Sequence, residues 1–485
     1  MAVRARLSPP SVTPPEEWPH FQIKIGSIPV SLLTKGGRRL EAESYLSSGF
    51  GIRAAIEARS NGWERLGGIA DIWMPGRLKG IQVGSAIGTP FLAATQVFDF
   101  RPVPRKWLAL ARTSSATERF VEPGQILVTC SGSVGRPTIA TTAHEGHLIS
   151  HDLLRVDARD DRNVGRLYAF LHSPQARAMC TTAQYGHIIK HLEEPHLAAL
   201  PVPECTDSEA EELNALFKNV LELRNRSHML SVEAERLFES ALGSFDATAG
   251  SELGFSVKAS SLSAGRRRLD ASAFNPNVSR ILAHLRKAGT GKVSLTDAGY
   301  EVWVPGRYKR VPAEDGVIYR DSADILEVSP DLTKRFADCA FGDAYRGRVK
   351  AGWVLVPCSG QVYGIIGTAV LAQASLEGQV VSNHVIRIAP KEEPAIPVGY
   401  LATALGHPTL GRPLVKALAF GSSVPEISPD DLAMFGIVRL EDSIERQIDA
   451  IALEAARCRS DADTIELAMG QRAGRIIDQL LGGQR

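Results

Sequence analysis

The chain alternates between short apolar runs and two long stretches with regularly spaced apolar residues. The short runs are broken by Gly and Pro and are rich in Val and Ile, which is typical of β-strands. Examples cover residues 125–129, 148–156, 353–356 and 380–388. Helical patterns interrupt them at residues 167–178 and 399–405. The pattern therefore predicts an α+β fold.

In each of the two long stretches, apolar residues recur at alternating steps of three and four. This spacing is typical of a coiled-coil seam, although a helix lying on its own domain also has an apolar face. Because the two stretches have similar lengths, we expect their helices to pair with each other. The seam positions are Leu213, Leu216, Val220, Leu223, Leu230, Leu237, Ile444, Ile448, Ile451, Ile465, Met469 and Ile476.

Much of the sequence forms an internal repeat. Residues 38–242 return in altered form at 267–480, at a nearly constant offset. The segment Cys130-Ser131-Gly132, for example, returns as Cys358-Ser359-Gly360. A period of this length is far longer than a solenoid repeat and indicates a duplicated domain. Two similar but non-identical modules are suited to binding two similar but non-identical targets.

The duplication and the long helices predict the domain organisation. The expected units are an N-terminal arm (1–20), a first domain (21–205), a first long helix (206–246), a second domain (251–440) and a second long helix (441–482).

Composition adds few restrictions. The formal net charge is +1, which neither requires nor excludes a nucleic-acid partner, since basic residues can gather on one face. The 6 cysteines are widely spaced without a CxxC pair, and no apolar stretch is long enough to span a membrane. The N-terminus has no apolar core of a signal peptide. We therefore expect a soluble cytoplasmic protein with reduced thiols and no membrane partner.

Candidate binding residues follow strand-like segments in both copies. Residues 123–136 read as a turn, a buried strand and a Ser/Gly loop that ends in Arg136. Residues 73–79 and 303–309 each place two cations after a Pro-Gly turn. Hydroxyls and cations of this kind suit contacts to phosphates and base edges, although ordinary solvated turns would look the same.

Candidate catalytic and metal-binding patterns are weak. His187 and His191 have the spacing of a zinc pair, but the HExxH glutamate is missing and the second copy has Ser422 and Glu426 there. His151-Asp152 becomes Asn383-His384 in the second copy, which disfavours a catalytic dyad. Walker A, GxGxxG and GxSxG motifs are also absent. We therefore predict no catalytic residue, no metal site and no cofactor in this chain, and recognition rather than reaction.

The order of these motifs resembles the specificity subunit of type I restriction–modification systems. The resemblance covers nearly all of the chain after residue 20. It is carried by a strand with a Ser-Gly loop, a Gly-x-Ile-Ile-Lys-His-Leu segment and a Leu-Pro-Val-Pro exit into a long helix. These lie at residues 124–136, 186–192, 200–203 and 208–243, and their second-copy counterparts at 352–360, 421–427 and 441–481.

The resemblance implies two target-recognition domains that each read one half of a bipartite DNA site. It also implies that the long helices pair antiparallel and dock methyltransferase subunits, two being expected. Those partners would bind S-adenosylmethionine, and a translocase–nuclease subunit using Mg and ATP could join. The second copy departs from the pattern, because residues 421–427 replace the Gly-x-Ile-Ile-Lys-His-Leu segment and its Leu-Pro-Val-Pro exit is lost.

We therefore expect double-stranded DNA as the main ligand. A helix of about 34 residues is about 50 Å long, which suits two readers about one turn of DNA apart. The expected DNA-binding residues are Arg77, Lys79, Ser131, Ser133, Arg136, His187, Lys190, Arg307, Lys309, Ser359, Gln361 and Ser422. Two alternatives remain open, namely a self-contained DNA-modifying or DNA-cleaving enzyme and a protein-binding adaptor of another defence complex.

Overall fold

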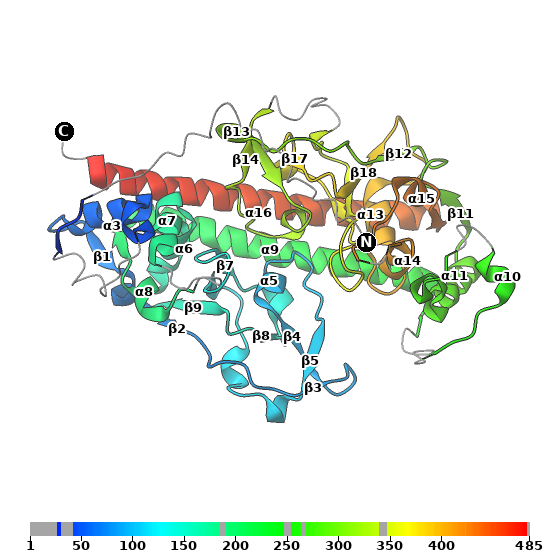
Figure 1. Cartoon of the computed structure of the whole chain (residues 1–485), viewed down its shortest axis with the longest axis horizontal. Helices are drawn as coiled ribbons and strands as arrows, with labels where there is room; N and C mark the ends of the chain where they lie inside the picture. Colours follow the sequence, from blue (N-terminus) through cyan, green and yellow to red (C-terminus); the bar gives the residue numbers. More distant parts are fainter. Residues whose placement is uncertain are drawn as a thin grey trace, which may run out of the picture.

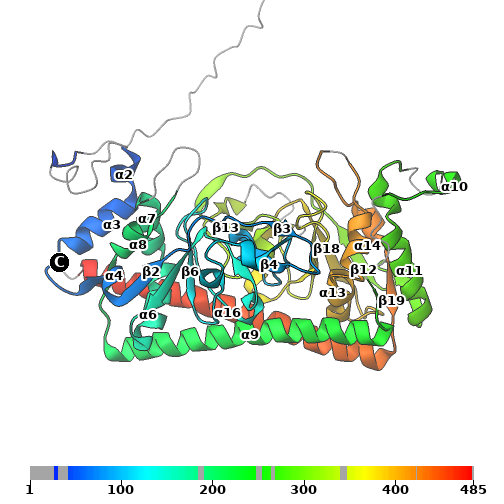
Figure 2. The same ribbon diagram turned by 90° about the horizontal axis from the view of Figure 1, so that it is seen from below.

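Two long helices lie side by side along the longest axis of the molecule (Figures 1 and 2). The computed structural model describes residues 27–30, 42–183, 191–246, 254–263, 268–338, 347–421 and 423–482. We call residues 42–205 the first half and residues 254–440 the second half. The predicted N-terminal arm, residues 1–20, lies outside the described residues. No helix in the described part is long and apolar enough to cross a membrane.

Helix α9 (Asp207–Leu242) follows the first half. The Thr206 side chain caps it by accepting from the Glu209 backbone N–H, and the Glu209 carboxylate binds the Thr206 backbone N–H in return. The helix ends at Gly243, whose φ of 79° is left-handed and favours glycine. The predicted helix at 206–246 is therefore present.

Helix α16 (Asp442–Gly482) follows the second half and runs antiparallel to α9. Arg472 near the end of α16 pairs with Glu212 near the start of α9. Midway along, the Ser227 hydroxyl donates to the Ala455 carbonyl at 2.8 Å. Opposite ends of the two helices therefore meet.

The buried positions of the two helices differ in part from the predicted seam. Leu213, Val220, Ile448 and Met469 are buried, but most other predicted seam positions are only half-buried. In α9 the buried face runs through Leu213, Phe217, Val220, Arg224, Ser227, Ala234, Phe238 and Leu242. A helix that packs against a partner helix and two flanking units buries a face wider than an a/d seam.

The first half is built from two four-stranded sheets and short helices. Its sheets have the orders β2-β9-β6-β7 and β3-β5-β4-β8, and β1 pairs with β10. The strands are β1 (Trp63–Arg65), β2 (Ala70–Trp73), β3 (Gln82–Val83), β4 (Thr89–Leu92), β5 (Lys106–Leu108), β6 (Ile126–Thr129), β7 (Pro137–Ile139), β8 (Leu148–Ile149), β9 (Leu153–Ala158) and β10 (Pro201–Pro203). The helices are α2 (Glu43–Leu46), α3 (Ser48–Glu57), α4 (Leu66–Ile69), α5 (Ala94–Val97), α6 (Val164–His172), α7 (Pro174–Ala183) and α8 (Glu194–Ala198).

The second half contains a sheet of the order β12-β18-β15-β16, which corresponds strand for strand to β2-β9-β6-β7. A three-stranded sheet, β14-β13-β17, and the pair β11-β19 complete its described strands. These strands are β11 (Gly291–Ser294), β12 (Tyr300–Trp303), β13 (Pro312–Arg320), β14 (Arg335–Phe336), β15 (Val354–Pro357), β16 (Val370–Leu371), β17 (Val380–Val381), β18 (Val385–Pro390) and β19 (Gly436–Arg439). The helices are α10 (Ala259–Leu262), α11 (Pro276–Ala288), α13 (Val398–Gly406), α14 (Arg412–Ala417) and α15 (Pro429–Ala433). The mixed α+β prediction is therefore confirmed.

Each half is attached to the helix that follows it by a glycine in close contact. The Gly165 N–H donates to Asn214 Oδ1 on α9 at 3.1 Å, and the Gly399 N–H donates to Asp449 Oδ1 on α16 at 2.6 Å. A Cβ atom at Gly165 would lie 2.4 Å from the Leu213 backbone, and one at Gly399 would lie 2.6 Å from the Asp449 backbone. Only glycine permits this approach of α6 and α13 to the long helices.

The far end of each long helix packs into the other half. Met469 and Ile477 of α16 are buried in the first half's core, and Phe238 and Leu242 of α9 are buried in the second half's core. Burying one such side chain contributes about 1.5–3 kcal/mol. The two halves and the two helices therefore share their cores.

The two halves also touch each other directly beside the helix pair. The Phe100 N–H donates to the Leu326 carbonyl at 2.9 Å, and the Val328 N–H donates to the Phe98 carbonyl at 2.7 Å. Arg177 of α7 adds an ion pair of 3.2 Å with Asp331. Sequence patterning gave no indication of this contact.

Candidate nucleic-acid interface

One edge of the four-stranded sheet gathers three loops in the first half. Because β9 runs antiparallel to both β2 and β6, the end of β2, the end of β6 and the start of β9 lie at the same edge. The pairs Trp73↔Arg155 and Thr129↔Leu153 fix this register. The loops after β2 and β6 and the turn before β9 therefore meet there.

The second half repeats this edge. Strand β18 runs antiparallel to β12 and β15, with Trp303 opposite Arg387 and Pro357 opposite Val385. The loops that follow β12 and β15 are those that carry the candidate cations and Ser359. The predicted binding segments of both copies are thus brought to equivalent sheet edges.

At the first edge, Ser131 joins a histidine and a carboxylate. Its Oγ lies 3.0 Å from His191 Nδ1 and donates to Asp152 Oδ1 at 3.3 Å. Ser131 and His191 also form an isolated antiparallel bridge. The Asp152 side chain is 42% exposed, so this trio faces solvent.

At the second edge, Ser359 joins the same two kinds of group. Its Oγ lies 2.9 Å from His384 Nδ1 and donates to Glu426 Oε1 at 3.1 Å. Ser359 and Glu426 form the corresponding bridge. The side chains of His384 and Glu426 are 42% and 55% exposed.

The histidine and the carboxylate exchange places between the two trios. Asp152 and His384 occupy the turn before β9 and β18, two residues after Ser150 and Ser382. His191 and Glu426 occupy the bridge position opposite the serine. Each edge therefore presents the same chemical groups in mirrored order, which gives two different patterns of hydrogen-bond donors and acceptors.

The geometry of the trios differs from that of a nucleophilic serine. In each, the serine hydroxyl donates to the carboxylate and also lies within hydrogen-bond distance of the histidine Nδ1, whose role depends on the tautomer. An activated serine instead gives its proton to a histidine that the carboxylate orients. No group of three His, Cys, Asp or Glu residues suited to a metal occurs among the described residues. The trios can donate and accept hydrogen bonds, as base-edge readers must.

A buried arginine holds the turn at each edge. Arg155 Nη1 donates to the carbonyls of Ser150 and Leu153, at 3.1 and 2.5 Å, on either side of Asp152. Arg387 Nη1 makes the same two bonds, at 2.8 and 2.5 Å, around His384. Both side chains are fully buried, and burial lowers the pKa of each to about 10. These arginines position the exposed member of the trio beside them.

The expected phosphate-binding cations are exposed on the loops after β2 and β12. Arg77 and Lys79 follow β2, and Arg307 and Lys309 follow β12. The loop after β2 is fixed by Arg119, whose Nη2 donates to the Gly76 carbonyl at 2.5 Å, and by paired bonds between Lys79 and Ser114. These four cations are therefore presented from the same sheet edges as the serines.

Other expected binding residues have different surroundings. Ser133 and Gln361 are exposed, and Gln361 Nε2 donates to the Ser423 carbonyl at 3.3 Å. Arg136 is engaged inside the protein, where it pairs with Glu327 of the second half at 2.8 Å and lies 4.1 Å above the Phe98 ring. His187, Lys190 and Ser422 lie outside the described residues.

Comparisons with known proteins give structural similarities only. No family model and no curated protein matches the chain. The chain is similar to the S subunit of a type I restriction–modification system from M. genitalium, at 13% identity and a TM-score of 0.31, over 87% of this chain and 97% of that chain. It is also similar to the HsdS subunit from Thermoanaerobacter tengcongensis, at 13% identity and a TM-score of 0.25, with the same coverage of 87% and 97%.

A further similar chain comes from a structure that describes the structural basis underlying complex assembly and conformational transition of the type I R-M system. It has 13% identity and a TM-score of 0.26, over 86% of this chain and 97% of that chain. All three TM-scores are below 0.5.

Sequence reasoning did not group Asp152, His191, His384 and Glu426 with the two serines. Members of one trio are far apart in the sequence, and strand pairing alone brings them together. One sequence feature could have pointed to this site. His151-Asp152 in the first copy becomes Asn383-His384 in the second, so the residue type changes at one repeated position.

Proposed function

We propose that this chain is the non-catalytic DNA-recognition subunit of a type I restriction–modification complex and reads a bipartite site. The observation that carries the proposal is the pair of equivalent sheet edges with the histidine and carboxylate exchanged. To read two unlike half-sites, a protein needs two binding surfaces that differ in their pattern of hydrogen-bond donors and acceptors. Two equivalent sheet edges with exchanged side chains meet this need.

Charge and exposure support contact with a nucleic acid. Arg77, Lys79, Arg307 and Lys309 are exposed on loops that leave the same sheet edges as the trios, where they can contact phosphates while the trio groups reach base edges. This division between phosphate contacts and base contacts is general in sequence-specific DNA binding.

The helix pair supports the spacing of the two readers. Helix α9 has 36 residues and is therefore about 54 Å long. Two half-sites one turn apart on the same face of B-DNA are separated by about 34 Å. A rigid pair of helices of this length can hold two readers at such a distance, and unlike readers imply a split, non-palindromic site. We further propose that methyltransferase subunits, expected to be two, dock on the helix pair as the family resemblance implies.

In this proposal the chain itself holds no cofactor. S-adenosylmethionine, and Mg with ATP where cleavage occurs, would belong to partner subunits, including a translocase–nuclease subunit if one joins. The resemblance described above provides this part of the proposal, and the residues of the chain are compatible with it.

The test is genome-wide adenine methylation in cells that carry the chain and its methyltransferase, with and without changes at one edge. Deleting the chain should abolish methylation at one split motif. The variant Ser131→Ala with His191→Ala should relax or change one half of that motif and leave the other half intact. The matched variant Ser359→Ala with His384→Ala should affect only the opposite half.

The main alternative, a self-contained DNA-modifying or DNA-cleaving enzyme, is tested with the purified full-length chain. DNA, magnesium and S-adenosylmethionine are supplied without any partner. Methyl transfer or strand cleavage that depends on Ser131 or Ser359 would replace our proposal with that alternative. Unchanged genomic methylation after deletion of the chain would also contradict our proposal of a DNA-recognition subunit.

A further inference from the structure

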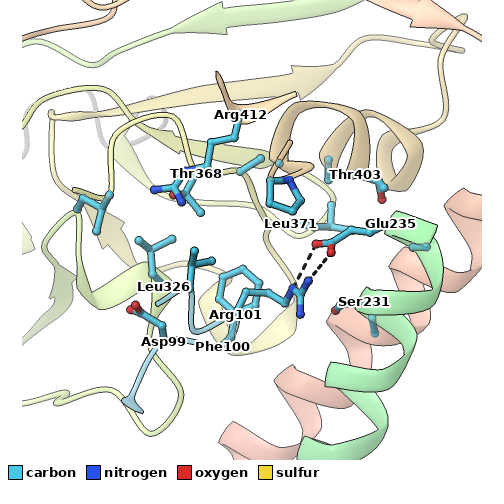
Figure 3. A pocket seen from close by; sticks show the side chains of 18 of the residues that line it. Asp99, Phe100, Arg101, Ser231, Glu235, Leu326, Thr368, Leu371, Thr403 and Arg412 are labelled. Carbon is cyan, nitrogen blue, oxygen red and sulfur yellow. Dashed lines mark hydrogen bonds and ion pairs between the residues drawn. The ribbon is translucent and has the colours of Figure 1, made fainter. Parts of the chain in front are cut away.

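A cavity lies where both halves meet the helix pair (Figure 3). Its volume is about 310 Å³, which is at the lower end of the range for small-ligand sites. Residues 99–105 of the first half form one wall, and the second half forms the opposite wall. Ser231 and Glu235 of α9 and Arg459 of α16 line its base. All four parts of the molecule therefore contribute to one partly open cavity.

Three cations converge on this cavity. Arg105 comes from the first half, and Arg412 and Lys416 come from α14 of the second half. Burial lowers the pKa of Lys416 to about 8, and the nearby charges of Arg412 and Arg105 add to this effect. Like charges held together in a partly buried site are unfavourable unless a counter-ion binds there.

The protein itself supplies little counter-charge to these cations. Within the described residues, neither Arg105 nor Lys416 has an ion pair or a side-chain hydrogen bond. Arg412 donates one bond to the Gly364 carbonyl at 2.7 Å, but its buried Nε has no partner there. A buried donor without a partner costs free energy that a ligand acceptor can recover.

The two acids that line the cavity neutralise the three cations only in part. Glu235 is occupied by a bidentate pair with Arg101, as Figure 3 shows. Burial raises the pKa of Asp99 to about 7, although Arg105 and Arg412 oppose that shift. At neutral pH the Asp99 carboxyl is therefore ionised for only part of the time.

Much of the remaining lining is apolar. Phe100, Leu326 and Leu371 are among the apolar residues that line it (Figure 3). A planar or aliphatic group could pack there while anionic groups contact the three cations. A DNA duplex is far too wide to enter a space of about 310 Å³.

We propose that this cavity binds a small organic phosphate, with its phosphates on Arg105, Arg412 and Lys416 and its apolar part against Phe100. The bound ligand would connect the first half, through Arg105, to the second half, through Arg412 and Lys416. It would therefore stabilise one relative placement of the two halves. The site is separate from the sheet edges that carry the proposed DNA contacts.

The test measures binding of ADP, inorganic pyrophosphate and adenosine to the purified full-length chain by calorimetry. We expect saturable binding of ADP, weaker binding of pyrophosphate and none of adenosine. Lys416→Gln and Arg105→Gln should each weaken ADP binding roughly tenfold or more, because each removes a charge-assisted hydrogen bond. The matched control Lys391→Gln alters an exposed lysine outside the cavity and should leave binding unchanged.

Several outcomes would overturn the proposal. One is absence of ADP binding, and another is equal ADP binding by all variants. If pyrophosphate bound as tightly as ADP does, the organic part of the ligand would contribute nothing to affinity, and the proposed ligand class would be wrong. Loss of duplex DNA affinity in Lys416→Gln and Arg105→Gln, without loss of ADP binding, would assign the cations to the DNA backbone. Arg105 lies on an exposed loop, so its variant keeps the test valid if Lys416→Gln fails to fold.

Discussion

Arg224 of α9 places its Nη2 atom 2.5 Å from Glu466 Oε2 of α16, and this pair lies fully inside the molecule. The same Nη2 atom is 2.6 Å from Asp463 Oδ1. Tyr168 of the first half donates to Glu466 at 2.6 Å, and Ser329 of the second half donates to it at 2.8 Å. Burial opposes ionisation of Glu466, but Arg224 and these donors hold its pKa below the usual value. One carboxylate thus joins both helices and both halves.

Removing Arg224 should strongly destabilise the chain. Arg224→Met leaves Glu466 and Asp463 without their buried counter-charge, and loss of one partner of a buried pair costs about 3–5 kcal/mol. The free energy of unfolding in urea measures this. The double variant with Glu466→Met should cost clearly less than the sum of the two single variants.

The control for this experiment is Arg226→Met, two residues away. Arg226 forms an exposed pair with Glu454 on the same two helices, at 3.1 Å. Its loss should change the free energy of unfolding by about 0–1 kcal/mol. If Arg224→Met and Arg226→Met changed the free energy of unfolding equally, the buried pair would stabilise the chain no more than the exposed pair does.

The chain should lose stability in mild acid because of neutral buried histidines. His144 accepts from the Thr141 N–H at Nδ1 and lies 3.0 Å from the Val97 carbonyl at Nε2, which fixes the neutral form. Burial lowers the pKa of His144 from 6.5 to about 4. Below pH 6.5 the unfolded chain therefore binds more protons than the folded one, and stability falls until about pH 4.

Between pH 7 and pH 5 this one histidine should account for a loss of about 2 kcal/mol in the free energy of unfolding. His144→Gln should be less stable at pH 7 but should show a correspondingly smaller loss on moving to pH 5. An unaltered slope in His144→Gln would rule out this assignment.

Adding a methyl group at Gly165 should disturb the attachment of the first half to α9. The added Cβ would lie 2.4 Å from the Leu213 backbone, so α6 would have to shift. We expect Gly165→Ala to lower the free energy of unfolding by about 1–3 kcal/mol. Gly51→Ala in α3 is the control, because its Cβ would meet nothing within 4 Å. That control should be neutral or stabilising by up to about 1 kcal/mol, since alanine favours a helix.

The exposed cations at the sheet edges should determine the salt dependence of DNA binding. Arg77→Gln and Lys79→Gln should each weaken binding similarly for all sequences and reduce the slope of log K against log salt by about 1. Lys218→Gln removes an exposed charge on α9 and should leave the slope unchanged. Fluorescence anisotropy at several salt concentrations provides the measurement. Identical slopes for all three variants would exclude Arg77 and Lys79 as phosphate contacts.

The sequence predicted the elements with strong local periodicity. The α+β character and the two long helices follow from spacing that a single segment carries, and both are present. The sequence did not reveal Arg224 and Glu466 as buried, because charged residues within a helix pattern read as solvated. Their burial depends on Tyr168 and Ser329, which lie far away in the chain.

The candidate site was predicted only in part for the same reason. Ser131 and Ser359 follow apolar strands, and that local pattern identified them. Asp152 and Glu426 are brought to these serines by pairing between distant strands. Arg136 was expected at the surface from its loop position, but Glu327 of the second half removes it from there.

The end of each long helix packs into the other half, and this arrangement has consequences for the folding of the chain and for the exchange of its halves. Met469 and Ile477 lie on α16 and complete a core that is otherwise built mainly from residues of the first half and α9. The first half is therefore fully packed only after α16 has been synthesised. Transplanting either half alone would separate it from part of its own core, so a hybrid chain should be stable only where the incoming half fits the helix end that packs into it.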